Sequence, residues 1–161
     1  MTEAPRLRRC EPRDEDDYVR LNLAFMRDVQ RGSAYWAAME LPSAQQLASV
    51  FKETQKWPDS MHIFVAELEG RIVAYVNAYS AYSVWSRGIT LTIDDLYVDA
   101  EHRGLGIGRA LMEHMEAFAR NSGYKRVQLH TEMTNTAAQN LYRSLGYEAE
   151  DMKFFMKRPD R

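Results

Sequence analysis

The chain has 161 residues, 45% of them hydrophobic and 27% charged, with a formal net charge of −2, which is typical of one soluble globular domain spanning residues 1–161. The charge balance gives no electrostatic reason to expect a nucleic-acid partner, and the single cysteine, Cys10, excludes an internal disulfide. No apolar run approaches the ~20 residues of a membrane span or forms a signal-peptide core, so we expect a cytoplasmic protein without a membrane partner.

The N-terminal third predicts one strand and two helices. Residues 6–10 form the expected strand, and Asp14 is expected to cap a helix that runs to about Gln30. Pro42 and Ser43 then precede a second helical pattern that runs toward Thr54.

The remainder of the chain alternates between strand and helix patterns. A hairpin is predicted where Glu69-Gly70 separates two apolar runs. The predicted strands cover residues 61–68, 71–79, 91–98 and 126–131, with further strand material at 147–157. Helical patterns follow at residues 107–122 and 136–145, and Gly123 and Gly146 are placed to end them.

Three glycines at alternate positions, Gly104, Gly106 and Gly108, separate the strand at 91–98 from the helix that follows. A strand, a glycine-rich loop and a helix N-terminus together can hold a phosphate, because unpaired backbone N–H groups and the helix dipole both favour an anion. The spacing fits neither a dinucleotide fingerprint nor a Walker A loop. By itself the loop leaves two alternatives open, a phosphate site and a glycine-rich turn without a ligand.

A second segment decides between these alternatives. Arg103, Gly106 and Gly108 form Arg-x-x-Gly-x-Gly, and Asn135 is followed by Ala138, Tyr142 and Gly146-Tyr147. Both patterns, in this order, resemble those of the GNAT (GCN5-related) N-acetyltransferases, and the resemblance extends over roughly residues 62–157. It implies an α/β (α+β) fold with a mixed, mostly antiparallel sheet, a splayed central strand pair and flanking helices.

The resemblance also implies acetyl-CoA as co-substrate. Main-chain amides of the loop are expected to hold its pyrophosphate, and the strand before the loop to bind the pantetheine arm, with a backbone N–H near Leu96 as the oxyanion donor. Asn135 and Ala138 are expected beside the cofactor. The expected cofactor-binding residues are Leu96, Tyr97, Val98, Arg103, Gly104, Leu105, Gly106, Ile107, Gly108, Arg109, Asn135, Ala138 and Tyr142.

Two groups carry the expected chemistry. Tyr142 matches the family tyrosine that protonates the departing thiolate; the alternative is a core aromatic on an amphipathic helix. Asp94 and Asp95 lie on a strand, where aspartate is disfavoured, and their segment resembles that of polyamine and Hpa2-type acetyltransferases. We interpret Asp94 as relaying the proton of the amine through water and Asp95 as attracting the cation. The alternative is ion pairing of these carboxylates with Arg126 or Arg87.

The acceptor is expected to be a primary amine, on a polyamine-like small molecule or on the lysine of a peptide. By analogy with the family, Tyr35 and Trp36 border its site, although they could equally belong to the core. No cluster of histidine and cysteine has metal-ligand spacing, so no metal is expected. A non-catalytic CoA-binding module, an acetyltransferase for an antibiotic or amino-acid amine, and a homodimer are the further readings that the family allows.

Overall fold

The computed structural model describes residues 4–159, and the chain divides into two compact units, Met1–His130 and Thr131–Arg161. The single-domain organisation expected from the sequence stays a prediction. No helix among the described residues is long and apolar enough to cross a membrane.

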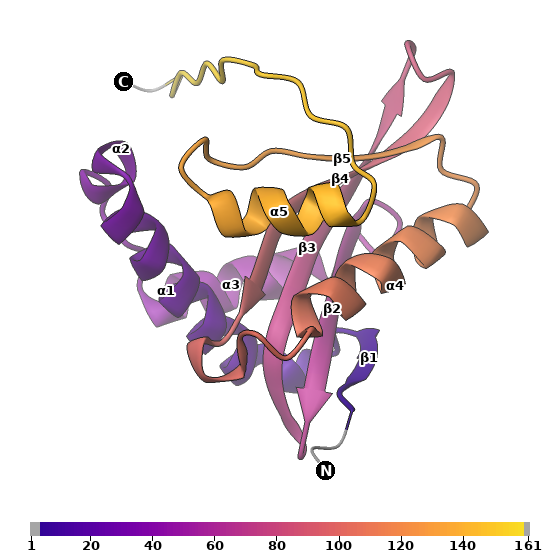
Figure 1. Cartoon of the computed structure of the whole chain (residues 1–161). Helices are drawn as coiled ribbons and strands as arrows, with labels where there is room; N and C mark the ends of the chain where they lie inside the picture. The colour runs from indigo at the N-terminus through magenta and orange to yellow at the C-terminus, as the bar shows by residue number, and fades with distance from the viewer. Residues whose placement is uncertain (1–3, 160–161) are drawn as a thin grey trace. The chain divides into compact units, whose positions relative to one another are not determined.

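The first unit is built on a sheet whose described strands follow the order β1-β2-β3-β4-β5 (Figure 1). Neighbouring strands are antiparallel except for the parallel pair β4–β5, so the predicted mixed, mostly antiparallel sheet is confirmed. The strands are β1 (Arg6–Arg9), β2 (Met61–Leu68), β3 (Arg71–Ser83), β4 (Gly88–Val98) and β5 (Arg126–Leu129). Glu69 and Gly70 both have positive φ, as a tight hairpin turn requires.

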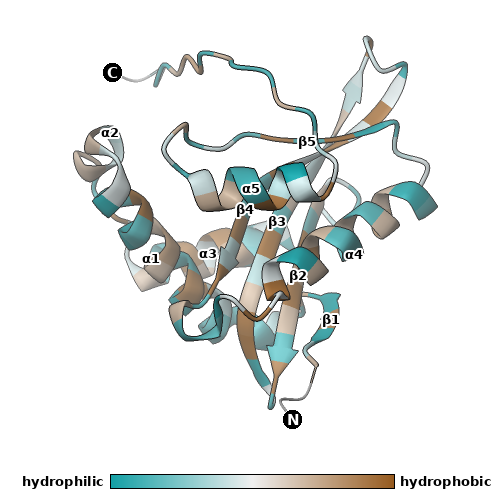
Figure 2. Ribbon diagram, in the orientation of Figure 1, coloured by the Kyte–Doolittle hydropathy of each residue, from teal (hydrophilic) through white to brown (hydrophobic). Residues whose placement is uncertain are grey.

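Helices cover both faces of this sheet. They are α1 (Glu15–Gly32), α2 (Ala34–Ala37), α3 (Ala44–Thr54) and α4 (Ile107–Asn121), with short 3₁₀ turns at Pro12–Asp14 and Ala100–His102. Alternation along β2 shows the two faces: Ile63 and Val65 join the core formed with α1 and α3, whereas His62 and Phe64 contact Phe118 of α4. In Figure 2 the strands between these helices are largely hydrophobic.

The predicted helix positions are confirmed, and the apolar stripes of α1, α3 and α4 each contribute buried residues. On α4, Ile107, Leu111 and Met115 are buried, and Gly123 follows the helix with a φ of 75°. Ser43 caps α3 in a capping box with Gln46. Cys10 is buried, and a free cysteine behaves as a small apolar residue.

Three sequence expectations need correction. Asp14 stands at the N-cap of α1 but makes no capping bond; its carboxylate instead accepts two hydrogen bonds from the Arg8 guanidinium, at 2.7 and 2.9 Å. Strand β3 extends to Ser83 and β4 begins at Gly88, where the sequence predicted strands over 71–79 and 91–98 only, because the two strands go on pairing to Ser83↔Gly88. Residues 147–157 form no strand, since no described strand pairs with them.

The second unit holds α5 (Thr136–Ser144), followed by Gly146 with a φ of 88° and an irregular segment. Tyr142 and Tyr147 pack edge-to-face, with 6.0 Å between ring centroids. The helix and its terminating glycine therefore agree with the sequence pattern.

Candidate active site

A β-bulge interrupts β4 at Asp94. The register runs Ala78↔Ile93 on one side and Asn77↔Asp95 on the other, so Asp94 has no residue opposite it on β3. One extra residue reverses which backbone groups of a strand face each neighbour. The alternation of outward-facing amides and carbonyls along β4 therefore changes phase at Asp94.

The pairing of β4 with β5 ends at Ile93↔Leu129, which leaves the edge of β4 beyond Asp94 without a neighbouring strand in this unit. This is the splay that the family resemblance predicted. The Asp99 amide donates to the Val73 carbonyl at 2.9 Å, which fixes the alternation of hydrogen bonds along the β3–β4 pair. By that alternation Leu96 and Val98 direct their backbone groups to the open edge, and Tyr97 directs its own toward β3.

The loop after β4 carries a row of unpaired amides. Gly104 and Gly106 have φ of 77° and 78°, values that residues with a Cβ adopt only with strain. Gly106 is the N-cap of α4 and supplies no side-chain cap. Among the described residues, the backbone N–H groups of Gly104, Leu105, Gly106, Ile107 and Gly108 have no hydrogen-bond partner. These amides and the dipole of α4 form an anion-binding arrangement.

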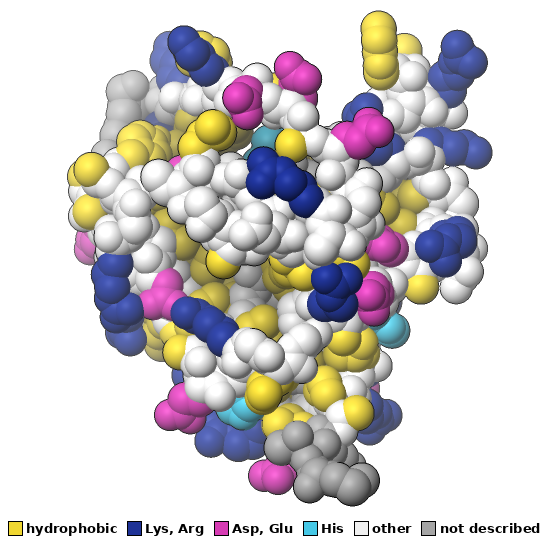
Figure 3. All heavy atoms as spheres, viewed as in Figure 1, with side chains coloured by type: hydrophobic (Ala, Val, Ile, Leu, Met, Phe, Trp, Pro, Cys, Tyr) yellow, Lys and Arg dark blue, Asp and Glu magenta, His cyan; other side chains and the backbone are white. Residues whose placement is uncertain are grey.

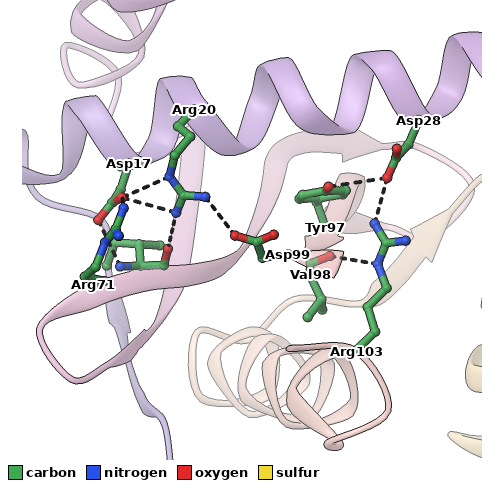
Figure 4. A network of polar contacts seen from close by, with 9 residues as sticks. Asp17, Arg20, Asp28, Arg71, Tyr97, Val98, Asp99 and Arg103 are labelled. Atoms are coloured by element: carbon green, nitrogen blue, oxygen red, sulfur yellow. Dashed lines mark hydrogen bonds and ion pairs between the residues drawn. The ribbon is translucent and has the colours of Figure 1, made fainter. Parts of the chain in front are cut away.

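The Arg103 side chain connects this loop to α1 (Figure 4). Its guanidinium donates to Asp28 at 2.7 Å and to the Val98 carbonyl at 3.0 Å, and it stacks on the Tyr97 ring. The Arg103 guanidinium lowers the pKa of Asp28. In this structure the charge of Arg103 is thus already partnered, and these contacts join the start of the loop to α1.

The two acidic residues of β4 lie in different environments. Asp94 is exposed, whereas Asp95 is partly buried and accepts a hydrogen bond from the Asn77 amide at 2.9 Å. Burial raises the pKa of Asp95, with the charge of Asp94 adding to the shift and the bond from Asn77 opposing it. Neither carboxylate forms an ion pair within residues 4–159, so the alternative of pairing with Arg126 or Arg87 is wrong.

The other expected site residues lie on short elements. Tyr35 and Trp36 belong to α2, which follows α1 directly; neither is buried, so the core alternative for them is wrong. Arg109 is on the first turn of α4, 3.8 Å from Glu113.

In the second unit, the Asn135 side chain caps α5 by accepting from the Ala138 amide at 3.1 Å, and burial raises the pKa of the Tyr142 phenol. That phenol is therefore protonated at neutral pH.

Sequence reasoning missed three residues near the site: Asp28, Asn77 and Tyr18. Asp28 partners Arg103, and Asn77 binds both Asp95 and the Tyr18 hydroxyl. Asn77 carried a usable signal, because an amide inside the apolar run of β3 requires a polar partner. Asp28 carried none, since an acidic residue on an amphipathic helix is ordinary.

One surface of the molecule carries both signs of charge. On the face in Figure 3, basic and acidic side chains are interspersed, with no large area of one sign. This agrees with the net charge of −2 and leaves the unpaired acidic residues of β4 as the feature that favours a cation.

A comparison with known families now bears on this geometry. The sequence model of the acetyltransferase (GNAT) family matches residues 27–147. The chain belongs to this family. The match includes β4, the glycine loop and α5, so the elements described above are those of a GNAT acetyltransferase.

Individual relatives agree with the family assignment. The chain is 35% identical over 152 residues to a mycothiol acetyltransferase of Thermobispora bispora, a match that covers 91% of this chain and 48% of the relative. It is 36% identical over 89 residues to streptothricin acetyltransferase of Streptomyces lavendulae, covering 55% and 45%. The chain thus spans about half the length of the curated relatives that it matches.

Solved structures show the same fold at low identity. A possible acetyltransferase from Clostridium difficile 630 superposes with a TM-score of 0.80 at 20% identity, covering 97% of this chain and 98% of the other. An aminoglycoside acetyltransferase from an uncultured soil sample gives 0.75 at 21%, covering 96% of both chains. The predicted fold class is therefore confirmed.

Proposed function

We propose that this GNAT chain transfers the acetyl group of acetyl-CoA to a primary amine. The observation that carries the proposal is the run of unpaired amides from Gly104 to Gly108, at the N-terminus of α4. Such amides can donate hydrogen bonds to the pyrophosphate oxygens of CoA, and acetyl-CoA is the co-substrate of the family. The residues present therefore fit the cofactor.

The open edge of β4 suits the pantetheine arm. An amide-bearing chain can pair with the outward backbone groups of Leu96 and Val98 as an added strand would. With the thioester at this edge, the Leu96 N–H can donate to the carbonyl oxygen as negative charge develops on it. The alternation favours Leu96 and Val98 over Tyr97 for these contacts, because the Tyr97 amide faces β3.

Proton transfer completes the reaction. The amine nitrogen attacks the thioester carbon, the C–S bond breaks, and the thiolate takes a proton from Tyr142. A phenol whose pKa is raised by burial stays protonated at neutral pH and can donate. We propose Asn135 and Ala138 as the second unit's contacts with the cofactor, on the basis of the family pattern.

The acceptor we propose is cationic before it reacts. The acidic pair Asp94 and Asp95, unpaired within the described residues, suits an ammonium group on a polyamine-like molecule or a lysine side chain. We propose Tyr35 and Trp36 as the aromatic border of its site. An antibiotic amine is the second candidate, favoured by the similarity to streptothricin acetyltransferase. The cytoplasmic location and the homodimer stay predictions.

A matched pair of glycine variants tests the cofactor site. Gly106 and Gly70 have φ of 78° and 77°, and a Cβ at either position meets no atom within 4 Å. Ala at either site should therefore cost a similar ~1 kcal/mol of backbone strain. We expect Gly106→Ala to weaken acetyl-CoA binding about tenfold by calorimetry and Gly70→Ala to leave it unchanged, because only Gly106 lies in the amide row.

Catalysis is tested by release of free CoA thiol from acetyl-CoA when polyamines, amino acids, aminoglycosides and lysine peptides are added in turn. We expect release with a cationic primary amine. Tight acetyl-CoA binding without release for any amine would instead favour the non-catalytic CoA-binding module. Equal effects of the two glycine variants on binding would remove the amide row from the cofactor site.

A further inference from the structure

The two adjacent carboxylates of β4 are not equivalent. Asp94 is the unpaired residue of the bulge and is exposed, so either of its oxygens can be solvated. Asp95 returns to the regular register opposite Asn77 and places its carboxylate on the same face of the sheet as Tyr75 and Tyr97, the face that α1 covers.

A chain of hydrogen bonds fixes the orientation of Asp95. The Tyr18 hydroxyl of α1 donates to Asn77 Oδ1 at 3.0 Å, and Asn77 Nδ2 donates to Asp95 Oδ2 at 2.9 Å. Tyr18 and Asn77 are buried, with 5% and 8% of their surface exposed. Because its carbonyl oxygen accepts from Tyr18, the Asn77 amide can present only its NH₂ group to Asp95.

Two further hydrogen bonds, both made by Asn22, fix the position of Tyr18 itself. Asn22 Nδ2 donates to the Tyr18 carbonyl at 2.8 Å, and the Tyr75 hydroxyl donates to Asn22 Oδ1 at 3.0 Å. The Tyr18 ring also packs against Phe51 and Tyr75. The donor side of the arrangement is therefore rigid, and it is anchored in the core rather than at the surface.

One oxygen of Asp95 remains available. Oδ2 is occupied by Asn77, and Oδ1 has no partner within residues 4–159. The titratable groups that act on Asp95 are Tyr18 from α1, Tyr75 from β3 and Asp94 from its own strand, and none of them carries positive charge. A largely desolvated carboxylate without a counter-ion is costly, and a cationic ligand would relieve that cost.

Building on the proposed function, we propose that Asp95 Oδ1 is the atom that receives the proton of the acceptor ammonium, and that Asn77 and Tyr18 are positioning residues for it. This gives Asp95 the base role that the sequence pattern alone suggested for Asp94. Asp95 directly precedes Leu96, whose outward N–H faces the open edge of β4, so the base and the oxyanion donor are consecutive residues.

The proton balance of the step follows. An ammonium loses two protons when it becomes an amide. One passes from nitrogen to Asp95 Oδ1 before the attack, because only the neutral amine has the lone pair that forms the C–N bond, and Asp95 then returns this proton to solvent. The C–S bond breaks, and the thiolate sulfur takes the hydroxyl proton that the proposed function assigns to Tyr142. The second proton from nitrogen passes to solvent, and the phenol regains a proton from solvent. The net products are the N-acetyl amine, the CoA thiol and one proton.

The burial that favours the neutral form of Asp95 suits this task. Its raised pKa brings the carboxylate closer to the working pH of a base, while the bond from Asn77 keeps it from rising further. Removing that bond should therefore raise the pKa of Asp95 again. The acid limb of the pH–rate profile would then move to higher pH.

The test is the pH dependence of kcat/KM for the best amine, measured by thiol release for the unaltered chain and for Asp95→Asn, Asp94→Asn, Asn77→Leu and Tyr18→Phe. Acetyl-CoA affinity and the urea midpoint of each variant are measured alongside. We expect Asp95→Asn to lower kcat about 100-fold or more and to abolish the acid limb, with acetyl-CoA affinity retained. Asp94→Asn should keep the limb.

The positioning residues have a signature of their own. Asn77→Leu should move the limb upward by about one pH unit, and Tyr18→Phe should move it in the same direction by less, because a hydrogen bond to the ionised form is lost or loosened. If Asn77→Leu does not fold, the shift of the acid limb in Tyr18→Phe tests the positioning role. An unmoved limb in a folded variant would make these residues merely structural and overturn their role.

The remaining outcomes separate the two proposals. A limb that persists in Asp95→Asn and vanishes in Asp94→Asn would overturn the inference and return the base role to Asp94, leaving the acetyltransferase proposal intact. No thiol release by the unaltered chain with any amine would overturn both.

Discussion

Acid should destabilise this protein through one buried histidine, His62 of β2, which is 2% exposed. Arg9 Nη2 lies 3.1 Å from His62 Nδ1, and a guanidinium only donates, so Nδ1 accepts and Nε2 carries the proton. Nε2 can then donate to the Ser80 hydroxyl, 2.7 Å away. Burial and the charge of Arg9 lower the pKa of His62 to about 4, from its ordinary value of 6.5.

The sign and size of the effect follow from linkage. Between pH 6.5 and 4 the unfolded chain binds a proton at His62 that the folded chain does not, so stability falls as the pH falls through this window. With these two pKa values the loss from this group between pH 7 and pH 5 is about 2 kcal/mol, and it approaches 3 kcal/mol at pH 4.

Urea unfolding of the unaltered chain and of His62→Gln at pH 7, 6 and 5 measures this loss. Gln is neutral throughout and keeps polar atoms near Ser80 and Arg9. The free-energy difference between the two proteins should shrink by about 2 kcal/mol from pH 7 to pH 5. His130→Gln, which removes an exposed histidine, is the matched control.

A difference between the unaltered chain and His62→Gln that is independent of pH would refute the reasoning, because it would mean that His62 binds its proton equally in both states. The result also matters for the assays of Asp95. A loss of activity near pH 5 has to be separated from loss of the fold, and His62→Gln provides a background whose free energy of unfolding changes less between pH 7 and pH 5.

Three other changes have definite expected results. Tyr142→Phe should lower kcat 100-fold or more with little change in acetyl-CoA affinity, and equal turnover would remove Tyr142 as the proton donor. Asp14→Ala leaves the buried Arg8 short of a partner and should cost about 3 kcal/mol in urea unfolding; a loss below 1 kcal/mol would show that the pair is dispensable. Asp28→Asn frees Arg103 from α1 and should weaken acetyl-CoA binding a few-fold by calorimetry, whereas unchanged affinity would show that the glycines alone set the loop.

The parts of the site that were predictable from the sequence are those set by local chemistry. The glycines at 104 and 106 indicate positive φ, and both adopt it. Hydrophobic spacing placed α4 and α5 to within a residue or two, because the periodicity of apolar residues that indicates a helix is local to the sequence.

The parts that were missed depend on which residues face one another across strands. Asp94 and Asp95 have the same side chain and are adjacent in the sequence. They differ in that Asp94 is the unpaired, exposed residue of the bulge, whereas Asp95 pairs with Asn77 and is partly buried. The position of a bulge is set by pairing between strands that are distant in sequence, so no local pattern reports it. Asp14 was assigned to a helix cap for the same reason: its partner Arg8 is across a turn, not in the helix.

The most direct test of the central claim is a crystal structure of the chain with CoA bound. We expect pyrophosphate oxygens within hydrogen-bond distance of the amides from Gly104 to Gly108, and the pantetheine arm paired with Leu96 and Val98 at the open edge of β4. A diphosphate bound away from those amides would contradict the account.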